Sequence, residues 1–182
     1  NFTYYAFVMD AFFMPAPENS RNNTYYVNNV APTVNNIILH SGQNIFLNLK
    51  NASSDILAST TSASIRDNNG CTDIVSATGT IYWSAVGGEH SCVSNPNNCY
   101  QIAQIDCQLD ASTCTSTTDA LMSGTCSTTL KFYALPTDAS SLNPASTTSW
   151  LGAIRAFDGT LSGVGTTTTG VDVITGIALN VE

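Results

Sequence analysis

The sequence predicts an all-β protein, a mostly antiparallel sandwich with a disulfide-stapled loop region. Threonine, serine and asparagine number 24, 20 and 18 of the 182 residues, whereas only 10% of residues are charged. These three residue types favour strands, turns and caps over helix interiors. Apolar and polar residues alternate with a period of two in many segments, and all six cysteines fall between positions 71 and 126. Seven tyrosines, seven phenylalanines and two tryptophans supply the apolar surface that disordered chains lack.

Individual strands are predicted from this alternation and from the turn residues beside it. Residues 34–39 and 44–50 flank Ser41-Gly42 and predict a hairpin, in which Ile45 and Leu47 face the core. A tight turn is predicted at 67–70, because Asn and Gly tolerate positive φ. Further strands are expected at 63–66, 73–77, 78–84, 100–107, 126–135 and 171–181. Residues 86–98 are expected to form a long loop.

Residues 51–66 and 138–155 resemble each other, since both contain the run Ala-Ser-Thr-Thr-Ser. A duplicated structural unit and coincidence in a low-complexity chain both explain this similarity. Either explanation predicts that the two segments are surface connections between strands.

Cysteine usage and charge indicate an extracellular protein. Six cysteines without metal-ligand spacing predict three disulfides formed outside the reducing cytosol, and sequence leaves 15 pairings open. Asn1, Asn22 and Asn51 begin Asn-x-Ser/Thr triplets and are candidate N-glycosylation sites. The net charge of −8 argues against nucleic-acid partners. No apolar run approaches the roughly 20 residues of a membrane-spanning helix, and no leader is recognised, so a processed chain without a transmembrane segment is expected.

No sequence motif identifies a catalysed reaction. Nucleophile elbows, zinc-protease helices and phosphate loops are absent from the sequence, and no cofactor or metal is predicted. Asp67, Asn69 and Asp73 offer oxygen ligands, but their spacing is better explained by a turn. Three Glu and ten Asp leave a secreted hydrolase with a carboxylate pair possible on residue types. A secreted sugar-binding domain or adhesin, using Trp83, Trp150 or the tyrosines, is the other alternative.

The two ends of the sequence have contrasting patterns. Residues 2–14 are apolar at both parities, so an extended conformation of this segment requires cover on both faces. From position 171 onward, valine, isoleucine and leucine occupy mainly odd positions, which predicts a strand with one buried face. We therefore expect an N-terminal arm at 1–14 and a single sandwich domain at 15–182, with a cysteine-rich excursion at 71–126.

This layout resembles the donor-strand pilins, the subunits of bacterial chaperone–usher pili and of glycosylated archaeal thread filaments. The resemblance implies an immunoglobulin-like, pilin-like sandwich that lacks one strand, which the N-terminal arm of the next subunit supplies. It implies a donor strand whose pocket-filling residues are Tyr5, Phe7, Met9, Ala11 and Phe13, or Phe2, Tyr4, Ala6 and Val8 in the other register. It also implies an acceptor edge at Val171, Val173, Ile177 and Leu179. Unlike chaperone–usher pilins, which usually carry a single early disulfide, this chain has central cysteines.

The predicted function is therefore structural. We expect a non-enzymatic, cell-surface filament subunit that forms a homopolymer by N-terminal donor-strand complementation, with glycans or host surfaces as further contacts. The alternative for the arm is an ordinary central strand of a closed monomer.

Overall fold

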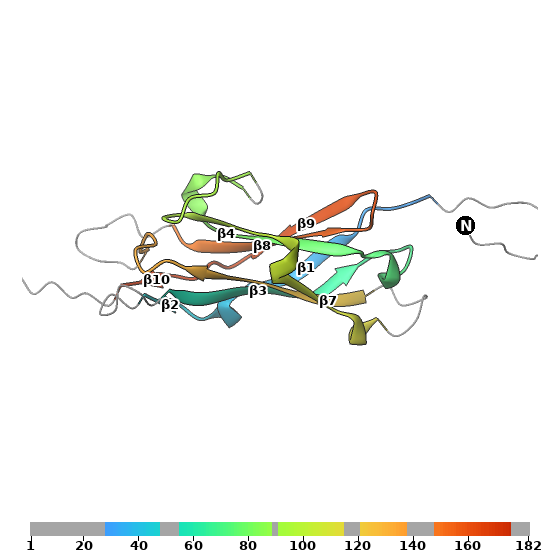
Figure 1. Ribbon diagram of the computed structural model, residues 1–182, viewed down its shortest axis with the longest axis horizontal. Helices are drawn as coiled ribbons and strands as arrows, with labels where there is room; N and C mark the ends of the chain where they lie inside the picture. Colours follow the sequence, from blue (N-terminus) through green and yellow to red (C-terminus); the bar gives the residue numbers. More distant parts are fainter. Residues whose placement is uncertain (1–27, 48–54, 89–90, 115–120, 138–147, 176–182) are drawn as a thin grey trace, which may run out of the picture.

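The computed structural model describes residues 28–47, 55–88, 91–114, 121–137 and 148–175. These residues confirm the all-β, antiparallel sandwich. One sheet has the strand order β1-β3-β7-β6, and the other has the order β5-β4-β8-β9. Every pairing within these two sheets is antiparallel. The two sheets lie one over the other, and their strands run along the long axis of the molecule (Figure 1).

The bounds of the elements follow from the backbone hydrogen bonds. The first sheet contains β1 (Thr33–Leu39), β3 (Ile56–Arg66), β7 (Leu121–Leu130) and β6 (Cys107–Asp110). The second contains β5 (Cys99–Ile102), β4 (Ser76–Trp83), β8 (Trp150–Phe157) and β9 (Ser162–Thr166). A small parallel pair joins β2 (Ile45–Phe46) to β10 (Val173–Ile174). Short 3₁₀ turns connect them: η1 (His40–Gly42), η2 (Cys71–Asp73), η3 (Ser84–Val86), η4 (Gln104–Asp106) and η5 (Ala111–Thr113).

This strand order is that of immunoglobulin-like sandwiches, in which strands A, B, E and D oppose C, F and G. Here β1, β3, β7 and β6 take the first four places, β4, β8 and β9 take the others, and β5 lies outside β4. The resemblance implied a sandwich lacking one strand. The described strands already fill both sheets of this order, and the place beside β8 is taken by the chain's own β9.

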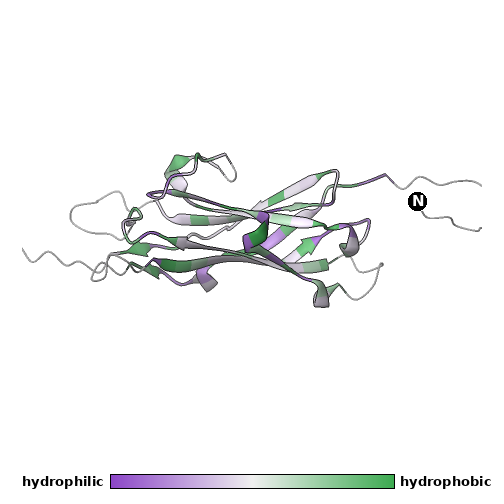
Figure 2. Cartoon of the chain, in the orientation of Figure 1, coloured by the Kyte–Doolittle hydropathy of each residue, from purple (hydrophilic) through white to green (hydrophobic). Residues whose placement is uncertain are grey.

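The core lies between the sheets and is built from alternate residues of their strands. Figure 2 shows hydrophobic and hydrophilic segments alternating along the ribbons. Trp150 is fully buried at the start of β8, and its indole Nε1 donates a 2.9 Å hydrogen bond to the Leu135 carbonyl oxygen. The other large, fully buried apolar side chains are Leu39, Ile45, Ile65, Ile81, Leu130, Ile154 and Val173.

A second cluster lies on the outer face of β4, where the predicted long loop packs. Tyr82 and Ala153 are buried there beneath the disulfide between Cys92 and Cys99, with Val86 packed against them. The side-chain amide of Gln101 donates to the Cys92 carbonyl oxygen at 2.7 Å. The disulfide thus holds a polar loop against one end of the sheet.

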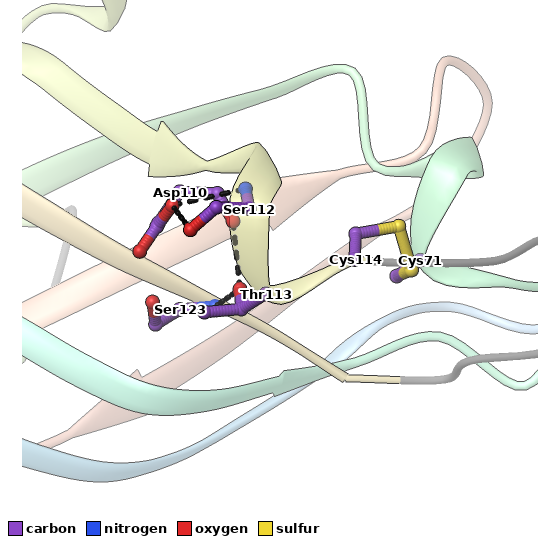
Figure 3. The surroundings of a disulfide bond; sticks show 6 residues. All are labelled: Cys71, Asp110, Ser112, Thr113, Cys114 and Ser123. Carbon is purple, nitrogen blue, oxygen red and sulfur yellow. Dashed lines mark hydrogen bonds between the residues drawn. A yellow bond between two sulfur atoms is a disulfide. The ribbon is translucent and has the colours of Figure 1, made fainter.

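The remaining disulfides fix the pairing that the sequence left open. Cys107 and Cys126 join neighbouring strands β6 and β7, and Cys71 is joined to Cys114. In the second case η2 is linked to the residue after η5, where the Asp110 carboxylate accepts hydrogen bonds from Ser112 (Figure 3). Residues 71–126 contain these bridges and also β4, β5, β6 and part of β7.

Three local predictions were wrong. The segments 34–39 and 44–50 form no hairpin, because β1 pairs with β3 while β2 pairs with β10. The chain leaves β1 through positive φ values at His40, Ser41 and Gly42, which redirect it to pair with β10. Residues 100–107 form two strands in different sheets, separated by η4. Residues 56–66 form a long inner strand rather than a surface connection.

Candidate strand-docking site

The described chain begins at one end of the sandwich, where Asn28 to Val30 are tied to neighbouring turns. The Val30 amide donates to Asn69 Oδ1 at 2.9 Å, and Asn69 Nδ2 donates to the Asn28 carbonyl oxygen at 3.2 Å. Asn29 Nδ2 donates to Asp158 Oδ2 at 3.0 Å. These bonds fix the point at which the preceding 27 residues join the sandwich.

Two carboxylates at this end have displaced pKa values. Burial raises the pKa of Asp67, and the nearby charges of Asp158 and Asp73 add to that rise. The side chain of Asp67 is fully buried and its Oδ2 has no hydrogen-bond partner, while Oδ1 accepts from the Asn69 amide. At Asp158, burial raises the pKa, but hydrogen bonds from Leu161, Thr160 and Asn29 outweigh it and lower the pKa below its usual value. The point where the N-terminal residues join the sandwich is therefore acidic and held by hydrogen bonds.

The predicted acceptor edge at the C-terminal strand is partly described. Val171 and Val173 are buried, whereas Ile177 and Leu179 lie outside the described residues. Val171 exchanges two backbone hydrogen bonds with Trp150. β10 pairs with β2, and the Val173 carbonyl oxygen accepts from the amide of Thr137. At these two valines, other segments of the same chain already occupy the positions beside the strand.

β9 of the second sheet packs closely against the start of the first sheet. β1 and the residue before it cross the inner face of β9 so closely that a Cβ built on Gly163 or Gly165 would overlap the carbonyl oxygens of Pro32 or Val34. Only a residue without a side chain fits there. The sandwich is thereby closed along this side by its own first strand.

The other side of the first sheet is less complete. β6 pairs with Ser123–Cys126 of β7, whereas β7 continues to Leu130 and pairs there with β3 alone. The last residues of β7 thus have one neighbouring strand among the described segments. Beside them, an ion pair of 2.6 Å joins Lys131 Nζ to Asp55 Oδ2, and the hydrogen bond that Lys131 donates to this carboxylate raises the pKa of the Lys131 amine.

An open cavity of about 440 Å³ lies along this part of β7. Leu57 and Ile105 border it and are 62% and 88% exposed, which is unusual for large aliphatic side chains near a sheet. The other lining residues are polar: Asp106, Gln108, Thr125, Ser127, Thr128 and Thr129. Hydroxyl, amide and carboxylate groups here can bind polar backbone atoms, while the two aliphatic side chains can pack on apolar ones.

Most other predicted site residues are not placed by the structure. The donor-strand residues, Phe2 to Phe13, and the glycosylation candidates Asn1, Asn22 and Asn51 lie outside the described residues. Within the described part of the chain, no group of three His, Cys, Asp or Glu could hold a metal ion, and no helix is long and apolar enough to cross a membrane. Trp150 is fully buried and Trp83 is partly buried, so the first has no face to offer a sugar.

Comparison with known proteins adds little. A scan against protein-family models and a search of curated proteins both found no match. Among solved structures, the chain is similar to AggA, the major subunit of aggregative adherence fimbriae type I from Escherichia coli. The two are 10% identical, the match covers 83% of this chain and 99% of AggA, and the TM-score is 0.28. At this TM-score the similarity supports neither the fold nor the function, which rest on the strand order and the edges described above.

Proposed function

We propose that this protein is a non-enzymatic, extracellular structural subunit that polymerises into a surface filament by donating its N-terminal arm to a neighbouring copy. The observation that carries the proposal is the apolar character of residues 2–14 at both parities, with Asp10 as their one charged residue. Such a segment has no face suited to water, and an exposed strand of this kind adds readily to an open sheet edge.

The fold supports this assignment in two ways. The described strands already take the places of the immunoglobulin-like order, so neither sheet needs the molecule's own arm as a central strand. The arm joins at one end of an elongated body, with β2 and β10 at the opposite end (Figure 1). A head-to-tail contact from such an end is heterologous, and it builds an open filament when its rotation does not close a ring. Three disulfides within one domain agree with an oxidising, extracellular location.

Deletion of residues 1–14 from the full chain tests the proposal. We expect the wild-type protein to form filaments in electron micrographs and the deletion variant to sediment as single particles. Adding a peptide of residues 1–14 from a separate source should produce a stable one-to-one complex of the deletion variant without polymerisation. Filaments formed by the deletion variant, or a wild-type protein that stays monomeric, would contradict the proposal.

A matched pair of substitutions tests which parity of the arm fills the acceptor pockets. Phe7→Ser changes the parity that includes Tyr5 and Met9, and Val8→Ser changes the other one. Loss of a buried aromatic ring removes about 1.5–3 kcal/mol of apolar transfer free energy. We expect Phe7→Ser to weaken assembly at least tenfold in critical concentration and Val8→Ser to weaken it less. The reverse order would assign the donor register to Phe2, Tyr4, Ala6 and Val8.

A further inference from the structure

We propose that the acceptor edge for the arm is the free end of β7, residues 127–130, beside the point where β6 begins, and that its occupant is the N-terminal arm of a second copy. This inference rests on the proposed function and places the docking edge away from the C-terminal strand. β3 pairs with β7 from Leu121 to Leu130, whereas β6 pairs with only four of those residues. A strand added in line with β6 would complete the sheet.

The disulfide between β6 and β7 shows which backbone groups face the open side. Cys107 and Cys126 lie directly opposite each other with a Cα–Cα distance of 4.0 Å, which is typical of a non-hydrogen-bonded pair. The backbone of Cys126 therefore points to β3, and by alternation the backbones of Ser127 and Thr129 point to the open side. Because a non-hydrogen-bonded pair is flanked by ladder hydrogen bonds, the Ser127 amide still belongs to the β6–β7 ladder, and Thr129 is the first outward-facing residue beyond it. Thr129 offers one donor and one acceptor to an incoming strand.

The side chains beside this edge suit an arm that is apolar at both parities. Leu57 is the partner of Thr129 on β3 and is 62% exposed, and Ile105 lies at the end of the β6 line and is 88% exposed. An added strand would cover both aliphatic side chains with one parity of its own. Thr128 points to the opposite face of β7 and is only half-buried. The alternate side chains of the arm, on that face, would therefore meet a surface that the described residues leave partly exposed.

The position of the edge favours a second copy as occupant. Thr33 pairs with Arg66 at the end where the arm joins, and Leu130 pairs with Ile56 at the other end of β3. Ten residues of strand separate Arg66 from Ile56, which is about 33 Å at 3.3 Å per residue. The 27 residues before Asn28 can span about 90 Å when extended, so the choice of a second copy rests on the head-to-tail polymer proposed above: a contact between opposite ends leaves each copy with one free edge and one free arm.

Proline substitution of Thr129 tests the edge without disturbing the β3 ladder. Proline removes an amide that faces away from β3, and its ring occupies the space of the incoming strand. Thr129→Val keeps the backbone amide and serves as the control at the same position. Ser162→Pro is the control at another edge, because the bond from the Asp158 amide to the Leu161 carbonyl flanks the pair Phe157–Ser162, so the Ser162 backbone also faces away from its partner strand β8. We expect Thr129→Pro to raise the critical concentration for filament assembly at least tenfold, and both controls to stay within threefold of wild type.

The outcomes separate this inference from the proposed function. If deletion of residues 1–14 abolishes filaments while Thr129→Pro assembles like wild type, the arm docks elsewhere and the β7 edge is overturned. If the deletion variant still forms filaments, the proposed function fails first. Equal loss of assembly in Ser162→Pro and Thr129→Pro would also overturn the assignment, because the effect would not be specific to β7.

Hydrogen exchange of the unmodified chain gives a second readout that does not depend on a variant folding. Assembly should slow exchange of the Thr129 amide at least a hundredfold relative to freshly diluted monomer. Unchanged exchange at this amide, with protection gained elsewhere, would overturn the inference. Protection of the Thr129 amide in a chain that sediments as a monomer would also overturn it, because the occupant would then be the molecule's own arm.

Discussion

The contact between Thr60 and Gly152 offers a stringent test of how closely the two sheets pack. Thr60 is a fully buried residue of β3, and Gly152 faces it from β8. A Cβ built on Gly152 would lie 2.5 Å from Thr60 Oγ1 and 2.8 Å from Thr60 Cγ2. Because both atoms sit in a closed core, Gly152→Ala should destabilise the protein by about 1–3 kcal/mol, the usual cost of overpacking.

Removing the Thr60 side chain should relieve this clash. Thr60→Ala deletes a buried methyl group, which costs about 1 kcal/mol, and also a hydroxyl that has no hydrogen-bond partner. Burial of an unpaired hydroxyl costs about 1–3 kcal/mol, so the two effects of Thr60→Ala nearly cancel. In the double variant the alanine at 152 keeps one tight contact, 3.2 Å to the Cβ of residue 60, and its cost should fall below about 1 kcal/mol.

Urea unfolding of the four proteins of this double-mutant cycle measures the coupling. We expect Gly152→Ala to be destabilising in the wild-type background and nearly neutral in the Thr60→Ala background, which is a coupling free energy of about 1–2 kcal/mol. Gly88→Ala is the matched control, since the nearest atom to its added Cβ is Ser91 Oγ at 3.6 Å. Additive effects of the two substitutions would refute the packing argument.

Two further predictions concern the disulfides and a buried acid. In the loop-entropy account, removing the bridge Cys71–Cys114 by paired serine substitution should cost about 4 kcal/mol and removing Cys92–Cys99 about 2.4 kcal/mol, because their sequence separations are 43 and 7; equal midpoints in urea would contradict this order. The pKa of Asp67 is raised above 3.8 by burial, so the folded state binds its proton more tightly than the unfolded state. Stability of the wild type relative to Asp67→Asn should therefore rise as pH falls through the folded pKa and level off below 3.8, and a constant difference across that range would rule out the assignment.

The sequence predicted the class of the fold and the parity of its strands. Ile45 and Leu47 are buried and Phe46 is 65% exposed, as alternation required. The turn at 67–70 is present and Gly70 adopts a φ of 126°. Local chemistry decides these features, because side-chain parity and positive φ are properties of a few neighbouring residues.

Strand pairing was not predictable in the same way, because it depends on residues far apart in the chain. Residues 56–66 were expected at the surface because they are rich in serine and threonine. In the fold, Thr60 and Ser62 are buried, and the Ser62 hydroxyl is satisfied by a 2.7 Å bond to the Asn35 carbonyl oxygen on β1. Thr60 is accommodated by the glycine opposite it on β8. Small polar residues can therefore build an inner strand where the facing sheet supplies a close, small partner.

The candidate docking edge had no signal in the sequence, since it arises from the unequal lengths of two paired strands. Cys99 of β5 is bonded to Asn95 of the disulfide loop, and β10 has β2 and Thr137 on its two sides. Short or covered edges of this kind resist unwanted pairing. β6 extends for only four residues and leaves the end of β7 beyond it.

The size of this edge determines where the free energy of assembly must come from. Thr129 offers two backbone groups, and at about 0.5–1.5 kcal/mol per hydrogen bond they contribute about 1–3 kcal/mol. A single buried aromatic or large aliphatic side chain contributes about 1.5–3 kcal/mol, and residues 2–14 contain eight Phe, Tyr and Met side chains. The backbone ladder thus sets the register and direction of the arm, whereas the side chains of the arm supply most of the affinity. Substitutions in the arm should consequently weaken assembly in proportion to the apolar area they remove, and substitutions at the edge should act mainly by blocking the approach of the strand.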